Sequence, residues 1–368
     1  MSAVTTTQSA ATTAPATDSR PAASALSLRW IISARDDLVW IIGSVASSYL
    51  LFALYVGGLV PLHPMVALWS VLVYAPHVFA TLSRTYFDRE ERRARARLLA
   101  GSLLFFAVGP VMVLAGAGFV FFFLAAMWAY YHLVKQHYGF MVLYKKKNGD
   151  LARVDNALDR ALIATGFWFP FVAFVARDAE AMARVPAQLH AGIWYAEKLL
   201  LAATVAVGVA WLARQAQRAV RREPLDVPKY LLLAAALPMH WVVLLTPMPH
   251  KPVAIVAILT IYHNFQYHRL VWFHNRKYVG PEARERHGAA ELISRRLVYY
   301  VFFGVLFGLW YQGPRQYVNW SAGLNNFDLK TQLLSSFLWG YAFVHYYLDS
   351  KIWRVRRDPS VGRALRME

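Results

Sequence analysis

The sequence predicts an all-α fold, namely a polytopic integral membrane protein built as a bundle of about ten transmembrane helices. Hydrophobic residues make up 58% of the 368 residues and charged residues only 16%. Ordinary soluble domains have about 45–50% and about 25%, respectively. Apolar runs long enough to cross a bilayer, about 20 residues each, recur along the chain. The segments between these runs alternate between many and few basic residues, which is typical of membrane proteins.

Ten apolar runs account for the expected helices, and the third and fourth are divided only by the stretch from Gly116 to Gly118. No large soluble domain fits between the runs. We therefore expect a disordered cytoplasmic tail at 1–27, a transmembrane helical domain at 28–353 and a basic cytoplasmic tail at 354–368. The predicted runs are 38–60, 65–83, 98–117, 118–144, 158–176, 193–213, 230–249, 252–275, 297–312 and 331–353.

The distribution of charge predicts the orientation in the membrane. The chain carries 39 Lys and Arg against 21 Asp and Glu, a formal charge of +18, which in a soluble protein would indicate nucleic-acid binding. When successive segments are assigned to opposite sides of the membrane, 32 basic residues fall on one side and 5 on the other. By the positive-inside rule, both termini are cytoplasmic in a bacterial-type inner membrane. The expected partners are therefore membrane lipids and not nucleic acid.

Six of the 12 histidines lie in the cytoplasmic halves of four predicted helices. At a rise of 1.5 Å per residue, each of these helices carries an imidazole roughly 10 Å below the cytoplasmic boundary. Ionisable groups inside a bilayer are costly, so a cluster at one depth predicts a functional site. The candidates are His77 in the second run, His132 and His137 in the fourth, His263 and His268 in the eighth, and His345 with Asp349 in the tenth.

The two histidine pairs each have a spacing of five, which separates the two rings by about 140° on a regular α-helix. Both members of a pair therefore cannot easily face one ion. Either a π-bulge brings them together, or one binds the ion while the other supports it or binds a second ion. In depth, His137 and His268 match His77 best. His274 and Asp88 are expected at the rim, and His240 in the core or a loop.

Neutral imidazole is a suitable metal ligand in a membrane, because it binds iron, copper or zinc without adding a charge. Asp349 follows His345 by four residues and thus shares its helical face, where it either binds the metal or orients a ligating ring. Histidines with one carboxylate and open positions favour non-haem iron, as one ion or two. Cysteine is absent, which excludes disulfides, thiolate zinc sites and iron–sulfur clusters.

The order of these motifs resembles that of the bacterial Brp/Blh-type β-carotene dioxygenases. The resemblance rests on Pro76-His77, His137-Tyr138-Gly139, His263 with His268, and His345 followed by Asp349. It implies a multispan membrane enzyme that holds non-haem iron at His77, His137, His263, His268 and His345 and cleaves a polyene with O₂.

We therefore expect an O₂-dependent non-haem iron oxidoreductase that acts on a lipid-soluble substrate, an isoprenoid or fatty acyl lipid. Two alternatives use the same residues. Histidines on facing helices at one depth also serve as axial ligands in a haem-binding electron carrier. A metal or solute transporter would use the polar residues as a pathway, but the outer half of the predicted bundle is nearly bare of them.

Overall fold

The computed structural model describes residues 26–322, 328–355 and 358–367, and most of these residues are helical. The only strands in these ranges are β1 (Leu26–Ser27) and β2 (Leu225–Asp226), which pair in parallel. The predicted all-α fold is therefore confirmed. The tail predicted at 1–27 lies outside the described residues, apart from the two residues of β1.

Seven helical segments in the described part of the chain are long and apolar enough to cross a membrane. The first is Ala34–Val56, formed by α1 (Ala34–Asp36), the π-helical η1 (Asp37–Ile42) and α2 (Val45–Val56), and the second is Leu62–Ser83, formed by α3 (Leu62–Trp69), the π-helical η2 (Ser70–Tyr74) and α4 (Ala75–Ser83). The third is Ala96–Leu114, formed by α6 (Ala96–Ser102) and α7 (Phe105–Leu114), and it is followed by α8 (Gly118–Asn148) and α9 (Arg153–Arg177). The last two are Ala187–Val220, formed by η3 (Ala187–Leu189) and α11 (His190–Val220), and α12 (Val227–Leu245).

Three further long helices coincide with the last three predicted apolar runs. They have the length of a span but fall short of the apolar composition of the other seven. They are α13 (Lys251–His274), α16 (Leu297–Ala322) and α17 (Leu329–Ile352). Short helices connect the long ones: α5 (Arg89–Ala94), α10 (Ala179–Met182), η4 (Asn275–Tyr278), α14 (Ala283–His287), α15 (Ala289–Ser294) and α18 (Pro359–Ala364).

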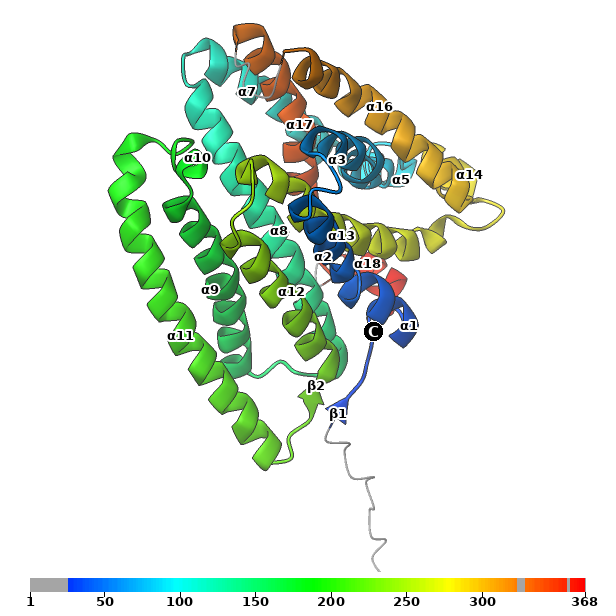
Figure 1. Ribbon diagram of the computed structural model, residues 1–368. Helices are drawn as coiled ribbons and strands as arrows, with labels where there is room; N and C mark the ends of the chain where they lie inside the picture. The colour runs from blue at the N-terminus through cyan, green and yellow to red at the C-terminus, as the bar shows by residue number, and fades with distance from the viewer. Residues whose placement is uncertain (1–25, 323–327, 356–357, 368) are drawn as a thin grey trace, which may run out of the picture.

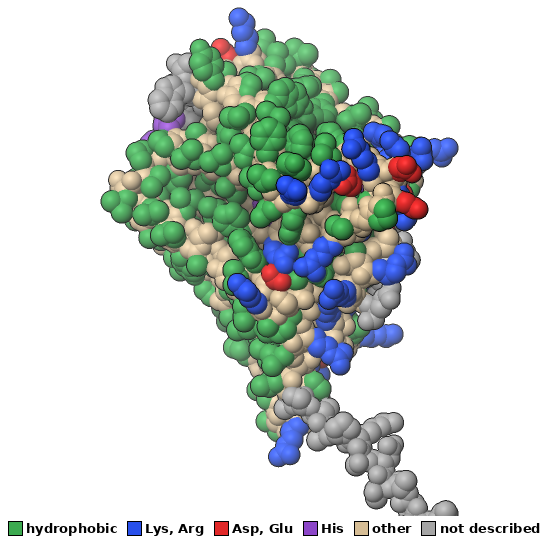
Figure 2. Space-filling view, turned by 90° about the vertical axis from the view of Figure 1, so that its right-hand side faces the viewer, with side chains coloured by type: hydrophobic (Ala, Val, Ile, Leu, Met, Phe, Trp, Pro, Cys, Tyr) green, Lys and Arg blue, Asp and Glu red, His purple; other side chains and the backbone are tan. Residues whose placement is uncertain are grey.

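The outer surface carries apolar side chains as a lipid-facing surface does. In Figure 1, α9 and α11 form one side of the bundle and α16 lies on the opposite side. Along α11, Leu199 is 72% exposed and Val209 and Leu212 are each 63% exposed. A soluble monomer rarely exposes such a continuous apolar face. On the face drawn in Figure 2, Lys and Arg gather along one side and toward the lower end, and much of the remainder is hydrophobic. Length, composition and exposure together fit an integral membrane protein.

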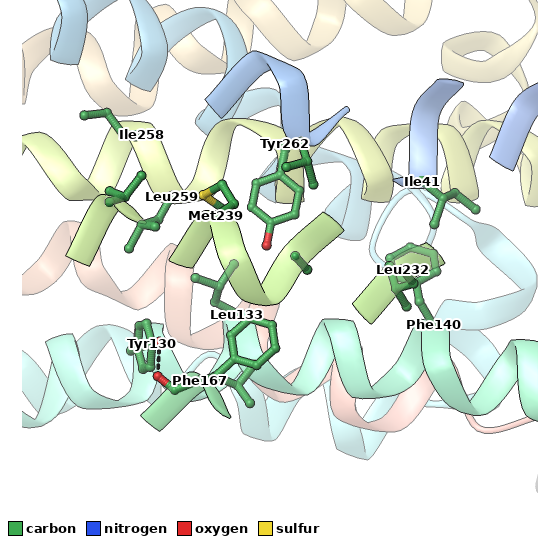
Figure 3. Close-up of a cluster of buried hydrophobic side chains, with 14 of the residues drawn as sticks. Ile41, Tyr130, Leu133, Phe140, Phe167, Leu232, Met239, Ile258, Leu259 and Tyr262 are labelled. Atoms are coloured by element: carbon green, nitrogen blue, oxygen red, sulfur yellow. Dashed lines mark hydrogen bonds between the residues drawn. The ribbon is translucent and has the colours of Figure 1, made fainter. Parts of the chain in front are cut away.

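The largest hydrophobic core lies between α8, α9, α12 and α13, and Figure 3 shows part of it. Tyr262 of α13 and Met239 of α12 face Leu133 and Phe167 from α8 and α9, and all four side chains are buried. The hydroxyl of Tyr130 donates a 2.7 Å hydrogen bond to the carbonyl of Phe167, which satisfies its polar atom inside the core. This packing occupies one face of α8 and one face of α13. Another face of α8 packs against α17, and another face of α13 packs against α4.

Close backbone approach determines the position of the helix that carries His77. A Cβ atom at Gly308 of α16 would lie 2.1 Å from the carbonyl oxygen of Val71, so only glycine fits there. Val71 belongs to the π-helical turn η2, which directly precedes α4. A π-bulge was one way to bring the members of each histidine pair together. The helices α8 and α13 instead run as α-helices through their histidine pairs, and the π-helical turn lies before His77.

A buried ion-pair network joins α8, α9, α11 and α12 at the end where β2 lies. Asp159, which is fully buried, pairs with Lys145 and with Lys229, whose Nζ lies 3.1 Å from its Oδ2. Asp150 accepts from Lys229 at 2.5 Å and from Arg218 at 3.0 Å. Each cation is therefore matched by a carboxylate, which is the condition for burying charge without a large penalty.

The segments that follow α4 and α13 fold into a compact cap. Asp88 is fully buried there and accepts hydrogen bonds from the hydroxyl of Tyr278 at 3.0 Å and from Nδ1 of His287 at 3.1 Å. His274 is also fully buried. Asp88 and His274 were expected at the rim, and the cap formed by α5, α14 and α15 buries both of them there.

The C-terminal segment predicted as a basic tail at 354–368 packs against the helical body in its described part. Val361 and Leu365 are 0% and 1% exposed and belong to the largest core. Nη2 of Arg95 contacts Oδ2 of Asp358 at 2.5 Å. Apolar residues on one face of α18 thus attach this basic segment to α13.

Candidate metal centre

Four helices that are distant in sequence each place one histidine at the same level of the bundle. His77 comes from α4, His132 from α8, His263 from α13 and His345 from α17. The ring centroids of His77 and His345 are 4.4 Å apart, and those of His132 and His345 are 4.8 Å apart. His263 lies 4.9 Å from His77 and 5.4 Å from His132. The four imidazoles therefore form one contiguous cluster, which we call the histidine cluster.

The nitrogens of this cluster are arranged as metal ligands would be. Ligand atoms of His77, His132 and His345 all lie within 4.8 Å of one another, and each ring is at least 92% buried. Among the described residues, Nδ1 of His77, Nε2 of His132, Nδ1 of His263 and Nε2 of His345 have no hydrogen-bond partner. A buried polar nitrogen without a partner is unfavourable, and four of them together are rare in a folded protein. A metal ion bound by His77, His132 and His345 would remove that cost for the three histidines whose ligand atoms converge, and His263 lies beside this group.

Asp349 is connected to the cluster through a hydroxyl group. Oγ1 of Thr81 lies 2.7 Å from Nδ1 of His345 and donates a 2.8 Å hydrogen bond to Oδ1 of Asp349. The hydroxyl of Tyr267 donates to the same carboxylate oxygen at 2.7 Å. When Nδ1 of His345 donates to Thr81, the lone pair of Nε2 is free to bind a metal. Of the two roles predicted for Asp349, the geometry favours orienting a ligating ring.

Tyr346 fixes the ring of His132 by stacking, with centroids 4.3 Å apart at an angle of 24°. On the other side of the cluster, Tyr267 packs edge-on against His77 at 4.6 Å. His268 lies at the margin, 6.1 Å from His77, and its Nδ1 lies 2.9 Å from the hydroxyl of Tyr300. These aromatic residues limit ring rotation, so the nitrogens are held in place before any ion binds.

His137 points away from the histidine cluster. Its Nδ1 donates to the carbonyl of Leu133 at 2.8 Å, and its ring lies 5.9 Å from His240. This follows from the spacing of five, which turns the ring of His137 about 140° from that of His132 on the regular helix α8. Sequence reasoning favoured His137 by depth, whereas the structure places the deeper His132 in the cluster.

His240 was expected to be an ordinary core or loop residue, and the structure places it in a second polar group with His137. It is fully buried, and its Nε2 lies 3.0 Å from the hydroxyl of Tyr262. It is the only histidine of α12, so no pairing within its own helix marked it in advance. Nε2 of His137 has no hydrogen-bond partner in the described part of the chain. This group adjoins the histidine cluster but does not share its ligand atoms.

An apolar groove lies on the outside of the bundle, beside the helix that carries His77. It has a volume of about 310 Å³ and is lined by apolar and aromatic side chains of α4, α15 and α16, with Phe79, Ile293 and Phe307 among them. Phe79 follows His77 by two residues on α4 and packs in one hydrophobic cluster with Tyr267. Tyr267 in turn contacts the ring of His77. Residues two apart on an α-helix point about 160° apart, so α4 itself lies between the groove and the ring of His77.

These features define a class of protein: a helical protein with segments suited to cross a membrane and a buried cluster of histidines where four helices meet. No family model, curated protein or solved structure matches the chain.

Proposed function

We propose that the chain is a membrane-embedded non-haem iron oxidoreductase that uses O₂ to oxidise a lipid-soluble substrate, an isoprenoid or fatty acyl lipid. The main support for this proposal is the convergence of four buried imidazoles, each with a nitrogen that lacks a hydrogen-bond partner among the described residues. These neutral imidazoles would hold iron without adding charge to the site, and iron would supply one-electron chemistry with O₂ there.

The protein residues have distinct tasks in this proposal. His77, His132 and His345 hold the ion, and His263 completes the set. Thr81 and Asp349 keep the ring of His345 in the tautomer that binds metal. His137 and His268 lie beside the site, where His137 with His240 is the place for a second ion if the protein binds two.

A lipid-soluble substrate is supported by the surroundings of the cluster. The apolar groove with Phe79 at its inner wall faces the outside of the bundle, where acyl chains or isoprenoids would lie. A haem is less suitable at this position, because a flat macrocycle needs a slot between two opposed rings. Four imidazoles with neighbouring centroids 4.4 to 5.4 Å apart occupy that space instead.

The experiment that tests the proposed function compares the lipids of cells that make the wild-type protein with those of cells that make the His345→Ala variant. Under aerobic conditions we expect an oxidised isoprenoid or fatty acyl product that only the wild type produces, together with O₂ consumption by its membranes. Indistinguishable extracts across isoprenoids, fatty acyl lipids and quinones would remove the oxygenase proposal. A Soret band in the purified protein would establish the haem carrier in its place.

We further propose that ten helices cross a bacterial-type inner membrane and that both termini are cytoplasmic, because 32 basic residues lie on one side and 5 on the other. A fluorescent protein fused after Glu368 is expected to fold and fluoresce, whereas alkaline phosphatase at the same position is expected to be inactive. Strong phosphatase activity from that fusion would reverse the orientation.

A further inference from the structure

Arg84 is a buried cation that makes no hydrogen bond through its guanidinium group to any described residue. It directly follows α4, is 0% exposed and is among the largest fully buried side chains of the described chain. None of its three guanidinium nitrogens has a hydrogen-bond partner in the described residues. A guanidinium group carries five N–H donors and a permanent charge, so its burial in this form is strongly unfavourable unless an anion binds to it.

The carboxylates near Arg84 are engaged by other groups. Asp88 accepts from Tyr278 and His287 and lies 3.6 Å from Nζ of Lys277. Asp349 accepts from Thr81 and Tyr267. Both carboxylates therefore accept hydrogen bonds from other groups, and among the described residues neither accepts one from Arg84.

An aromatic residue orients the guanidinium group of Arg84. Its Cζ lies 4.1 Å from the ring centroid of Trp353, so the face of the guanidinium group is occupied and its N–H edge remains. The ring of His274 lies 5.5 Å from Trp353 on another side, and Nε2 of His274 is likewise buried without a partner among the described residues. A planar N–H edge beside a second polar nitrogen is well suited to the oxygens of a carboxylate or phosphate.

The position of Arg84 relates this anion site to the histidine cluster. Arg84 follows His77 by seven residues, about two helical turns or ~10 Å toward the cap. Nε1 of Trp353 lies 3.4 Å from the hydroxyl of Tyr267, which contacts both Asp349 and the ring of His77. Trp353 also packs in the hydrophobic cluster that contains Phe79 and Ile293, two residues that line the groove.

We propose that Arg84 binds an oxyanion, the carboxylate or phosphate group of a ligand whose apolar part lies among the aromatic residues beside the histidine cluster. The identification of this ligand as the substrate rests on the proposed function. The binding of an anion by Arg84 is independent of it. The substrate class is then an amphiphile with an anionic head group held about two helical turns from the candidate metal ligands. A free anion from the cytosol would use the same N–H edge.

The test measures binding of oleate and, separately, of inorganic phosphate to the purified full-length protein in phosphatidylcholine nanodiscs. The wild type is expected to bind at least one of the two. Arg84→Gln is expected to weaken that binding roughly 10- to 100-fold, the range for loss of a charge-assisted hydrogen-bonded pair. Arg84→Lys keeps the positive charge but loses the planar set of guanidinium N–H donors, so its affinity is expected to lie between those of the wild type and Arg84→Gln. The matched control is Arg97→Gln, because Arg97 belongs to the same basic segment but is exposed.

The outcomes distinguish an amphiphile from a free anion, and they distinguish failure of the anion site from failure of the proposed function. Tighter binding of oleate supports an amphiphile, and equal or tighter binding of phosphate supports a free anion at the same site. If folded wild type binds neither probe, or if both Arg84 variants bind like wild type, the anion site is refuted. Iron content is measured on the same samples. Arg84-dependent binding in a protein that never contains metal would refute the proposed function and leave the anion site standing.

Discussion

Replacing His345 with alanine is expected to remove most of the iron from the purified protein. His345 has the most central ring of the cluster, 4.4 Å from His77 and 4.8 Å from His132, and it is fully buried. Its loss removes a ligand and also disconnects the Asp349–Thr81 pair that orients it. The effect should exceed the roughly 10- to 100-fold loss of affinity that removing a supporting hydrogen-bond partner causes.

Iron per protein chain, measured by mass spectrometry of the metal after purification from iron-replete cells, checks this expectation. Thr81→Val keeps the shape of the side chain but removes the hydroxyl, so we expect an intermediate loss of iron. His190→Ala is the matched control, because His190 lies at the start of α11, far in sequence from the four cluster histidines, and its Nε2 bonds to the nearby carbonyl of Val185. Equal iron content in wild type, His345→Ala and His190→Ala would show that the cluster does not bind the metal.

Replacing Asp159 with alanine is expected to be the most damaging change to stability outside the site. Asp159 is fully buried and pairs with Lys145 and Lys229, which are 1% and 0% exposed. Its removal leaves both ammonium groups to share Asp150, which already pairs with Arg218. Breaking a buried ion pair in this way typically costs about 3–5 kcal/mol.

The free energy of unfolding in mixed detergent and SDS, followed by circular dichroism, measures that loss. Glu285→Ala is the control, because Glu285 is an exposed carboxylate in the cap. We expect the control to change the free energy of unfolding by less than about 0.5 kcal/mol. If Asp159→Ala and Glu285→Ala have the same small effect, the network contributes little to the stability of this end of the bundle.

The sequence predicted the helices well because the physics that forms them is local. Each apolar run falls on a helical segment, although the first three segments consist of two or three successive helices. The boundary between the third and fourth runs falls at Gly116, which has a positive φ of 76°. The convergence of histidines from α4, α8, α13 and α17 could also be anticipated, since depth in a membrane follows from helical rise and the positions of charged segments.

The details of the site could not be predicted, because they depend on how each helix is rotated about its axis. Depth alone favoured His137, but rotation of α8 turns His132 toward the cluster and His137 toward His240. The π-helical turn η2, which precedes His77, and the contact of Gly308 with Val71 fix the rotation of α4. No pattern within one helix contains that information. The burial of Arg84 likewise depends on a cap formed by segments about 200 residues away.

The central claim is that one group of imidazoles from four helices holds a metal ion. Metal analysis and iron K-edge X-ray absorption of the wild-type protein test it most directly. We predict about one iron per chain, or two if His137 and His240 hold a second ion, with the scattering pattern of several imidazole nitrogens. This pattern should be lost in His77→Ala and His132→Ala. Absence of bound metal from folded wild type, or iron that remains in a porphyrin, would contradict the account.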